Sequence, residues 1–146
     1  MKTSGPYTTM AWMVVGLGLW CPLYARQPKM VQVDRSYNGR EVVLAVGDVV
    51  DISLAENPTT GFRWELAAKP GPACLLVKST FEPAVGPPGK GGTHHWHFQA
   101  AHSGTAEVAL EYRRPWERNT PPAKRFMLSL RVRKERTPQD STARSE

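Results

Sequence analysis

The chain has 146 residues, which suits one domain with its own hydrophobic core and leaves too little length for a second. Its 19 Lys and Arg against 13 Asp and Glu give a formal charge of +6, but the basic residues are dispersed. The one basic cluster, at Arg131, Arg133, Lys134 and Arg136, has no aromatic platforms or nucleic-acid motif beside it, so we expect no nucleic-acid partner.

The N-terminal segment has the pattern of a secretory signal. Lys2 supplies a positive charge, and the uncharged apolar run from Met10 to Trp20 has about half of the ~20 residues that a membrane-spanning helix needs. Residues 1–25 are therefore predicted to be a signal peptide, cleaved after Ala25. We expect a secreted or periplasmic protein.

The two cysteines allow no internal disulfide in the secreted form, because Cys21 lies in the signal segment and Cys74 is then the only thiol left. Lipid attachment at Cys21 is an alternative. The bulky Trp20 disfavours it, since lipidation signals prefer small residues just before the cysteine. We expect no stable membrane anchor, and we expect Cys74 to be a small buried residue.

Short runs of alternating apolar and polar residues, separated by turn residues, make up the rest of the chain. The predicted strands span residues 29–34, 41–46, 49–54, 62–66, 74–81, 93–100, 105–113 and 125–133. Gly47 and Asp48 form a hairpin signal between the second and third of these runs. The mixed pattern of 74–81 suggests a strand covered on both faces.

No segment shows a convincing helical period. The strand pattern predicts one all-β domain over residues 26–136, an immunoglobulin-like antiparallel β-sandwich of seven or eight strands. Trp64 is expected in its core, because it lies mid-strand on the apolar face. Residues 137–146 are predicted to be a disordered polar tail, and the protein is expected to be a monomer.

Three connections between the strands have the character of contact loops. In the first, Asn57–Phe62, Pro58 fixes its own φ and Gly61 can take a positive φ, so the tip is stiff. The second, Gly89–Gly92, ends a long stretch rich in Pro and Gly. The third, Arg114–Trp116, follows a strand end and places Trp and Arg together, the residue types most enriched in binding hot spots. We predict that all three meet at one end of the sandwich.

The sequence shows no group of residues suited to catalysis. Cys74 lies in an apolar strand with no base signalled beside it, and the glycine-rich loop lacks the helix and the Lys-Ser/Thr pair of a phosphate site. His95 and His97 share one face of a strand, so a two-ligand metal site is possible, with Glu107 or Glu111 as a third ligand. Half-exposed strand histidines are the simpler interpretation, and we expect no enzyme activity, no cofactor and no metal.

Taken in order, the three loops resemble the signature loops of the chagasin-type inhibitors of papain-like cysteine peptidases, over residues 42–132. The resemblance implies an immunoglobulin-like sandwich whose loops form a wedge in the peptidase cleft, with Thr59 and Thr60 over the catalytic cysteine and histidine. It implies that Gly91 and Gly92 pair along the non-primed side and that Trp116 packs on the primed side. The implied peptidase-binding residues are Asn57, Pro58, Thr59, Thr60, Gly61, Phe62, Gly89, Lys90, Gly91, Gly92, Arg114, Pro115 and Trp116.

The implied mechanism is reversible occlusion of the cleft without chemistry. Because Pro87 and Pro88 stand where family members often place apolar side chains, we expect residues 87–90 to set selectivity. Two alternatives stay open. Arg114 can cover Trp116 locally as a cation–π partner, and the chain can be an immunoglobulin-like adhesion or carbohydrate-binding module in which Trp116 stacks on a sugar.

Overall fold

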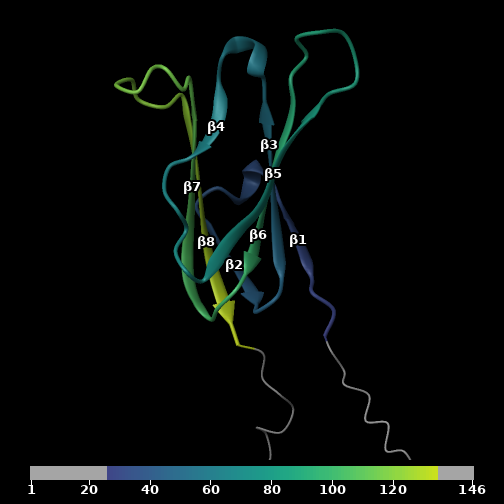
Figure 1. Ribbon diagram of the computed structural model, residues 1–146, viewed down its shortest axis with the longest axis vertical. Helices are drawn as coiled ribbons and strands as arrows, with labels where there is room; N and C mark the ends of the chain where they lie inside the picture. The colour runs from purple at the N-terminus through teal and green to yellow at the C-terminus, as the bar shows by residue number, and fades with distance from the viewer. Residues whose placement is uncertain (1–25, 135–146) are drawn as a thin grey trace, which may run out of the picture.

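The structure, a computed structural model, describes residues 26–134. The predicted signal peptide, with its alternative lipidation site, and the predicted tail lie outside this range. The described part folds into two four-stranded sheets packed face to face (Figure 1). In sheet order, the first contains β1 (Met30–Val33), β3 (Val49–Glu56), β6 (Gly92–Ala100) and β5 (Cys74–Pro83), and the second contains β2 (Arg40–Ala45), β8 (Lys124–Arg133), β7 (Gly104–Arg113) and β4 (Arg63–Leu66).

The eight strands confirm the predicted all-β sandwich. Most pairs are antiparallel, but β1 pairs parallel with β3 and β2 pairs parallel with β8, so each sheet is mixed. Two short 3₁₀ turns, η1 (Arg35–Tyr37) and η2 (Pro58–Thr60), complete the described elements. Within residues 26–134, no helix has the length and apolar character to cross a membrane.

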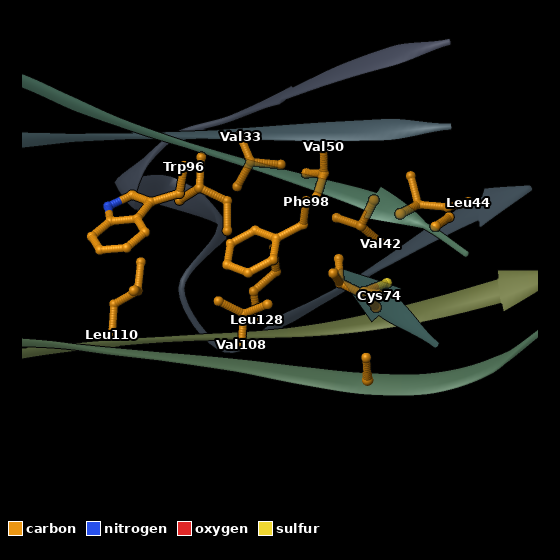
Figure 2. Close-up of a cluster of buried hydrophobic side chains, with 14 of the residues drawn as sticks. Val33, Val42, Leu44, Val50, Cys74, Trp96, Phe98, Val108, Leu110 and Leu128 are labelled. Carbon is orange, nitrogen blue, oxygen red and sulfur yellow. The ribbon is translucent and has the colours of Figure 1, made fainter. Parts of the chain in front are cut away.

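The core lies between the sheets and follows the alternation of the sequence (Figure 2). In β8 the even-numbered residues from Phe126 to Val132 are buried and the odd-numbered ones are exposed. Trp64 and Cys74 are buried as predicted, and burial raises the pKa of the Cys74 thiol, which keeps it protonated and unreactive. Each fully buried large aliphatic or aromatic side chain stabilises the fold by about 1.5–3 kcal/mol.

The hairpin predicted at Gly47 and Asp48 is wrong. These residues form a corner between β2 of one sheet and β3 of the other, and the Gly47 N–H donates to the Ala100 carbonyl at 2.8 Å. Both runs bury one apolar face against the other sheet, with Leu44 and Ile52 in the same core. Burial of these faces across the sandwich outweighs the local turn signal.

The prediction that residues 74–81 are covered on both faces is also wrong. β5 is an edge strand, bonded only to β6, and its apolar residues are open to solvent: Leu75 is 54%, Leu76 42% and Val77 61% exposed. The register shifts between Leu76 and Lys78, which marks a β-bulge. Bulges at sheet edges disrupt the pairing ladder and oppose edge-to-edge aggregation.

Candidate functional site

The first loop is held by the side chain of Asn57. Its Oδ1 accepts hydrogen bonds from the Thr59 N–H at 3.2 Å and the Thr59 hydroxyl at 2.6 Å, while its carbonyl accepts from the Thr60 hydroxyl at 2.7 Å. Asn57 thereby caps η2, with Pro58 at the start of the turn and Gly61 closing it at φ +79°. The loop is a closed, internally bonded unit, and Thr59 and Thr60 at its tip are exposed.

The second loop contacts the first at its base. Asn57 Nδ2 donates to the Gly89 carbonyl at 3.1 Å. Gly91 has φ +80°, and a Cβ atom there would lie 2.8 Å from the Glu56 carbonyl oxygen, so only glycine allows the two backbones to approach this closely. Lys90 does not extend outward, because its ammonium donates to the Val85 carbonyl at 3.2 Å within the loop.

The third loop contacts the first on its other side. Arg114 Nε donates to the Thr60 carbonyl at 3.4 Å, and the guanidinium lies 4.6 Å from the centre of the Phe62 ring. A Cβ atom on Gly61 would lie 2.6 Å from Cη2 of Trp116, so the indole packs against bare backbone. Trp116 is still 68% exposed. Arg114 therefore covers Phe62, and the alternative that it covers Trp116 is wrong.

These contacts bring all thirteen predicted residues to one end of the sandwich. Figure 1 shows the β3–β4, β5–β6 and β7–β8 connections together at the upper end, with the β2–β3 connection at the other. The loops form a row, with the first loop in the middle and bonded to both neighbours. Such a row is ordered before it binds anything, which suits insertion into a partner's groove.

Residues that were not among the predicted site residues support this row from below. Glu56, whose side chain is 3% exposed, accepts from the Trp64 N–H at 2.8 Å and lies 3.1 Å from Nδ1 of His94. The Tyr112 hydroxyl accepts from the Asn57 N–H at 3.2 Å, and its ring stacks on Phe62 at 5.4 Å. The alternation of β3 is a sequence signal that could have pointed to Glu56, because this residue continues the inward-facing positions of the strand.

The face shared by His95 and His97 is confirmed, but the third ligand named for it is wrong. Glu107 and Glu111 lie on β7 in the other sheet. The carboxylate beside the two imidazoles is Asp51 of β3. This group lies on the strands, apart from the row of loops.

Comparison with known proteins identifies the chain. Residues 43–130 match the model described as chagasin family peptidase inhibitor. Chagasin of Trypanosoma cruzi is 35% identical over an alignment of 106 residues that covers 69% of this chain and 96% of chagasin. The chain belongs to the chagasin family of peptidase inhibitors. The predicted resemblance is confirmed, and membership of an inhibitor family confirms that the protein is not an enzyme.

Solved structures agree on the fold of this chagasin-family protein. A cysteine protease inhibitor from Entamoeba histolytica is similar with a TM-score of 0.65 at 20% identity, over 74% of this chain and 99% of that one. Amebosin is similar with a TM-score of 0.58 at 28% identity, over 73% of this chain and 100% of that one. The immunoglobulin-like architecture predicted from the strand pattern is therefore confirmed.

Proposed function

We propose that this chagasin-family protein is a reversible inhibitor of papain-like cysteine peptidases that fills the active-site cleft with its three loops. The observation that carries the proposal is the row itself. Asn57 bonds the first loop to the second, and Arg114 and Trp116 join the third loop to the first. Little conformational entropy remains to be lost on binding, so an interface of about 1,600 Å² can reach nanomolar affinity, about −12 kcal/mol.

The first loop is the part that we place over the catalytic cysteine and histidine. The hydroxyls of Thr59 and Thr60 already donate to oxygens of Asn57. Covering them with an enzyme therefore leaves no unpaired donor, which would otherwise cost about 1–3 kcal/mol. The mechanism is occlusion: the capped turn blocks the thiolate without presenting a scissile carbonyl in attack geometry, so no acyl-enzyme forms and inhibition is reversible.

The flanking loops fix the row along the cleft. We assign the non-primed side to the second loop, whose tip projects from the closure where the Ala84 N–H donates to the Gly91 carbonyl at 2.9 Å. The primed side is assigned to Trp116, a large aromatic face open to solvent beside an Arg, as in binding hot spots. Residues 87–90 remain the segment expected to set selectivity.

The proposal includes the cellular location that the sequence predicts. The pattern of residues 1–25 supports export, which would place the inhibitor outside the cell or in the periplasm. It would act there as a monomer and bind one peptidase molecule.

Titration against papain tests the proposal. We expect loss of papain activity to reach completion at one equivalent of the protein, and we expect dilution or a competing substrate to restore it. Trypsin, a serine peptidase, serves as the control and should keep its activity. If micromolar protein leaves papain and several related enzymes fully active, the carbohydrate-binding or adhesion alternative gains support, and Trp116 should then be tested against immobilised glycans.

A further inference from the structure

Three side chains with metal-binding atoms meet on the outer face of the first sheet. In the antiparallel pair of β3 and β6, Asp51 is directly opposite His97, and His95 is two residues before His97 on the same face. The intervening Ile52 and Trp96 point the other way, into the core shown in Figure 2. One ligand atom from each of Asp51, His95 and His97 falls within a group whose members are all within 4.8 Å of one another.

Asp51 is a buried carboxylate on a face that should be open to water. Its side chain is 7% exposed, because the two imidazoles flank it. His95 Nδ1 lies 3.2 Å from each of its oxygens, and His97 Nε2 lies 3.4 Å from Oδ1. Within residues 26–134, these imidazole nitrogens are the polar partners of the carboxylate.

We propose that Asp51, His95 and His97 bind one divalent ion of the zinc class. In a tetrahedral zinc site with ligand bonds of about 2.0–2.1 Å, neighbouring ligand atoms lie roughly 3.3–3.4 Å apart. The separations of 3.2 and 3.4 Å from Asp51 already match this spacing. An ion can therefore replace the hydrogen bonds among these groups with small side-chain rotations, and water can take the fourth position.

The surroundings hold one imidazole in the orientation that such a site needs. Glu82 of β5 places Oε2 3.7 Å from His95 Nε2. When Nδ1 binds the ion, the opposite N–H faces this carboxylate, which is the arrangement that orients histidine ligands in metal sites. Ser53 Oγ lies 3.2 Å from His95 Nδ1, so a hydroxyl also borders this ligand atom.

The ligand chemistry selects the metal. Two imidazoles and one carboxylate suit Zn²⁺, and by the general affinity order also Ni²⁺ and Cu²⁺. Mg²⁺ and Ca²⁺ require mainly oxygen ligands and should not bind. The ion would fasten β3 to β6, and these strands run directly into the first loop at Asn57 and out of the second loop at Gly91.

Calorimetry on the full chain, produced without a histidine tag, tests the site. We expect Zn²⁺ to bind one-to-one and to raise the unfolding temperature by about 5 °C or more at saturation, while Mg²⁺ gives no heat of binding. Co²⁺ should bind in its place with the intense visible absorption of a four- or five-coordinate ion. Absence of one-to-one zinc binding would overturn the proposal.

Variants assign the binding to these residues. His97→Gln and Asp51→Asn should each weaken zinc binding by roughly 100-fold or more, beyond the 10–100-fold typical of a lost outer-shell partner. His102→Gln removes an exposed histidine outside the cluster and should leave the affinity unchanged. Circular dichroism checks that each variant folds. Undiminished zinc affinity in His97→Gln would refute the assignment. These zinc measurements involve no peptidase, so their outcome is independent of whether the protein inhibits papain.

Discussion

Trp116 is the large aromatic residue that the loops expose for contact with a partner. A large aromatic ring that is 68% exposed contributes little to folding. Its position is nevertheless fixed, because the ring packs against Gly61 where no side chain intervenes. Arg114 holds the same loop to the Thr60 carbonyl and pairs with Glu117 at 3.0 Å. The indole is therefore preorganised for a partner, and this is how a hot-spot residue gains affinity.

Replacing Trp116 with alanine should weaken papain inhibition by about 1–3 kcal/mol, roughly 5- to 150-fold, mainly through faster dissociation. The unfolding temperature should stay the same, because the lost ring surface faces solvent. Dissociation rates measured after dilution of the complex check this. Val43→Ala, which removes an exposed side chain on β2 away from the loops, is the control and should leave the rate unaltered. A wild-type rate in Trp116→Ala would exclude Trp116 from the interface.

At the scale of elements, the ends of strands matter more to the site than their middles. β3 ends at Glu56, whose carboxylate binds residues near the start of β4 and β6, through the Trp64 N–H and the His94 ring. His94 in turn lies 2.7 Å from Ser79 Oγ on β5 and stacks on Trp96. One inward-facing acid therefore sets the positions from which two loops leave the sandwich.

Sequence reasoning found the parts of the fold that local pattern determines. Alternation placed the strands and most of the core, and Pro58 and Gly61 indicated the stiff turn that η2 forms. Prediction from the sequence failed for the features that depend on the order of strands in the sheets. Nothing local tells that residues 74–81 form an edge or that Gly47 turns between sheets, because these depend on pairing with distant strands.

The site, too, has parts that the sequence predicts and parts that only the fold reveals. The loop residues carry sequence signals because turns need Pro, Gly and Asn at fixed places. The bonds between loops, such as Asn57 to Gly89, join residues far apart in the chain and follow only from the folded sandwich. Asp51 beside His95 and His97 is of the same kind, since it required the register of β3 against β6.

Removing the Glu56 carboxylate should destabilise the fold and loosen the loops. Glu56→Ala leaves the buried Trp64 N–H unpaired, so we expect a loss of about 1–3 kcal/mol in the free energy of unfolding, together with weaker inhibition. Glu56→Gln keeps an oxygen that can accept this bond and should lose less. Urea unfolding monitored by tryptophan fluorescence measures both. Equal midpoints for Glu56→Ala and the wild type would mean that this carboxylate does not stabilise the loop bases.

At the scale of the whole molecule, the sandwich has two different ends. One carries the loops, and the other carries the connection between β2 and β3 (Figure 1), which contains Gly47 and Asp48. The carboxylate of Asp48 accepts from the Lys29 N–H at 3.0 Å and the Ala45 N–H at 2.9 Å, and it pairs with Arg26 at 3.4 Å. It thus joins the segment before β1 to the corner between the sheets. A substitution at this end can therefore change the stability of the fold without touching the loops.

The ionisation of Asp48 makes this end sensitive to acid. Burial opposes its charge, but the hydrogen bonds from Ala45 and Lys29 and the charge of Arg26 outweigh burial and lower the pKa of Asp48 below its ordinary value of 3.8. A carboxyl whose pKa is lower in the folded state stabilises the fold above the unfolded pKa. That stabilisation is lost as the pH falls below 3.8 and through the folded-state pKa.

Asp48→Asn should therefore lower the free energy of unfolding at pH 7 by about 1–3 kcal/mol, and the difference from the wild type should shrink as the pH falls from 4 towards 2. Urea unfolding across this range measures both. Glu107→Gln removes an exposed carboxylate on β7 and is the control, with little change expected at pH 7.

Papain inhibition by Asp48→Asn at pH 7 should equal that of the wild type, because the two ends act independently while the protein is folded. A stability difference that stays constant down to pH 2 would show that the ionised carboxylate is not its source, and weakened inhibition by the folded variant would show that the corner and the loops are coupled.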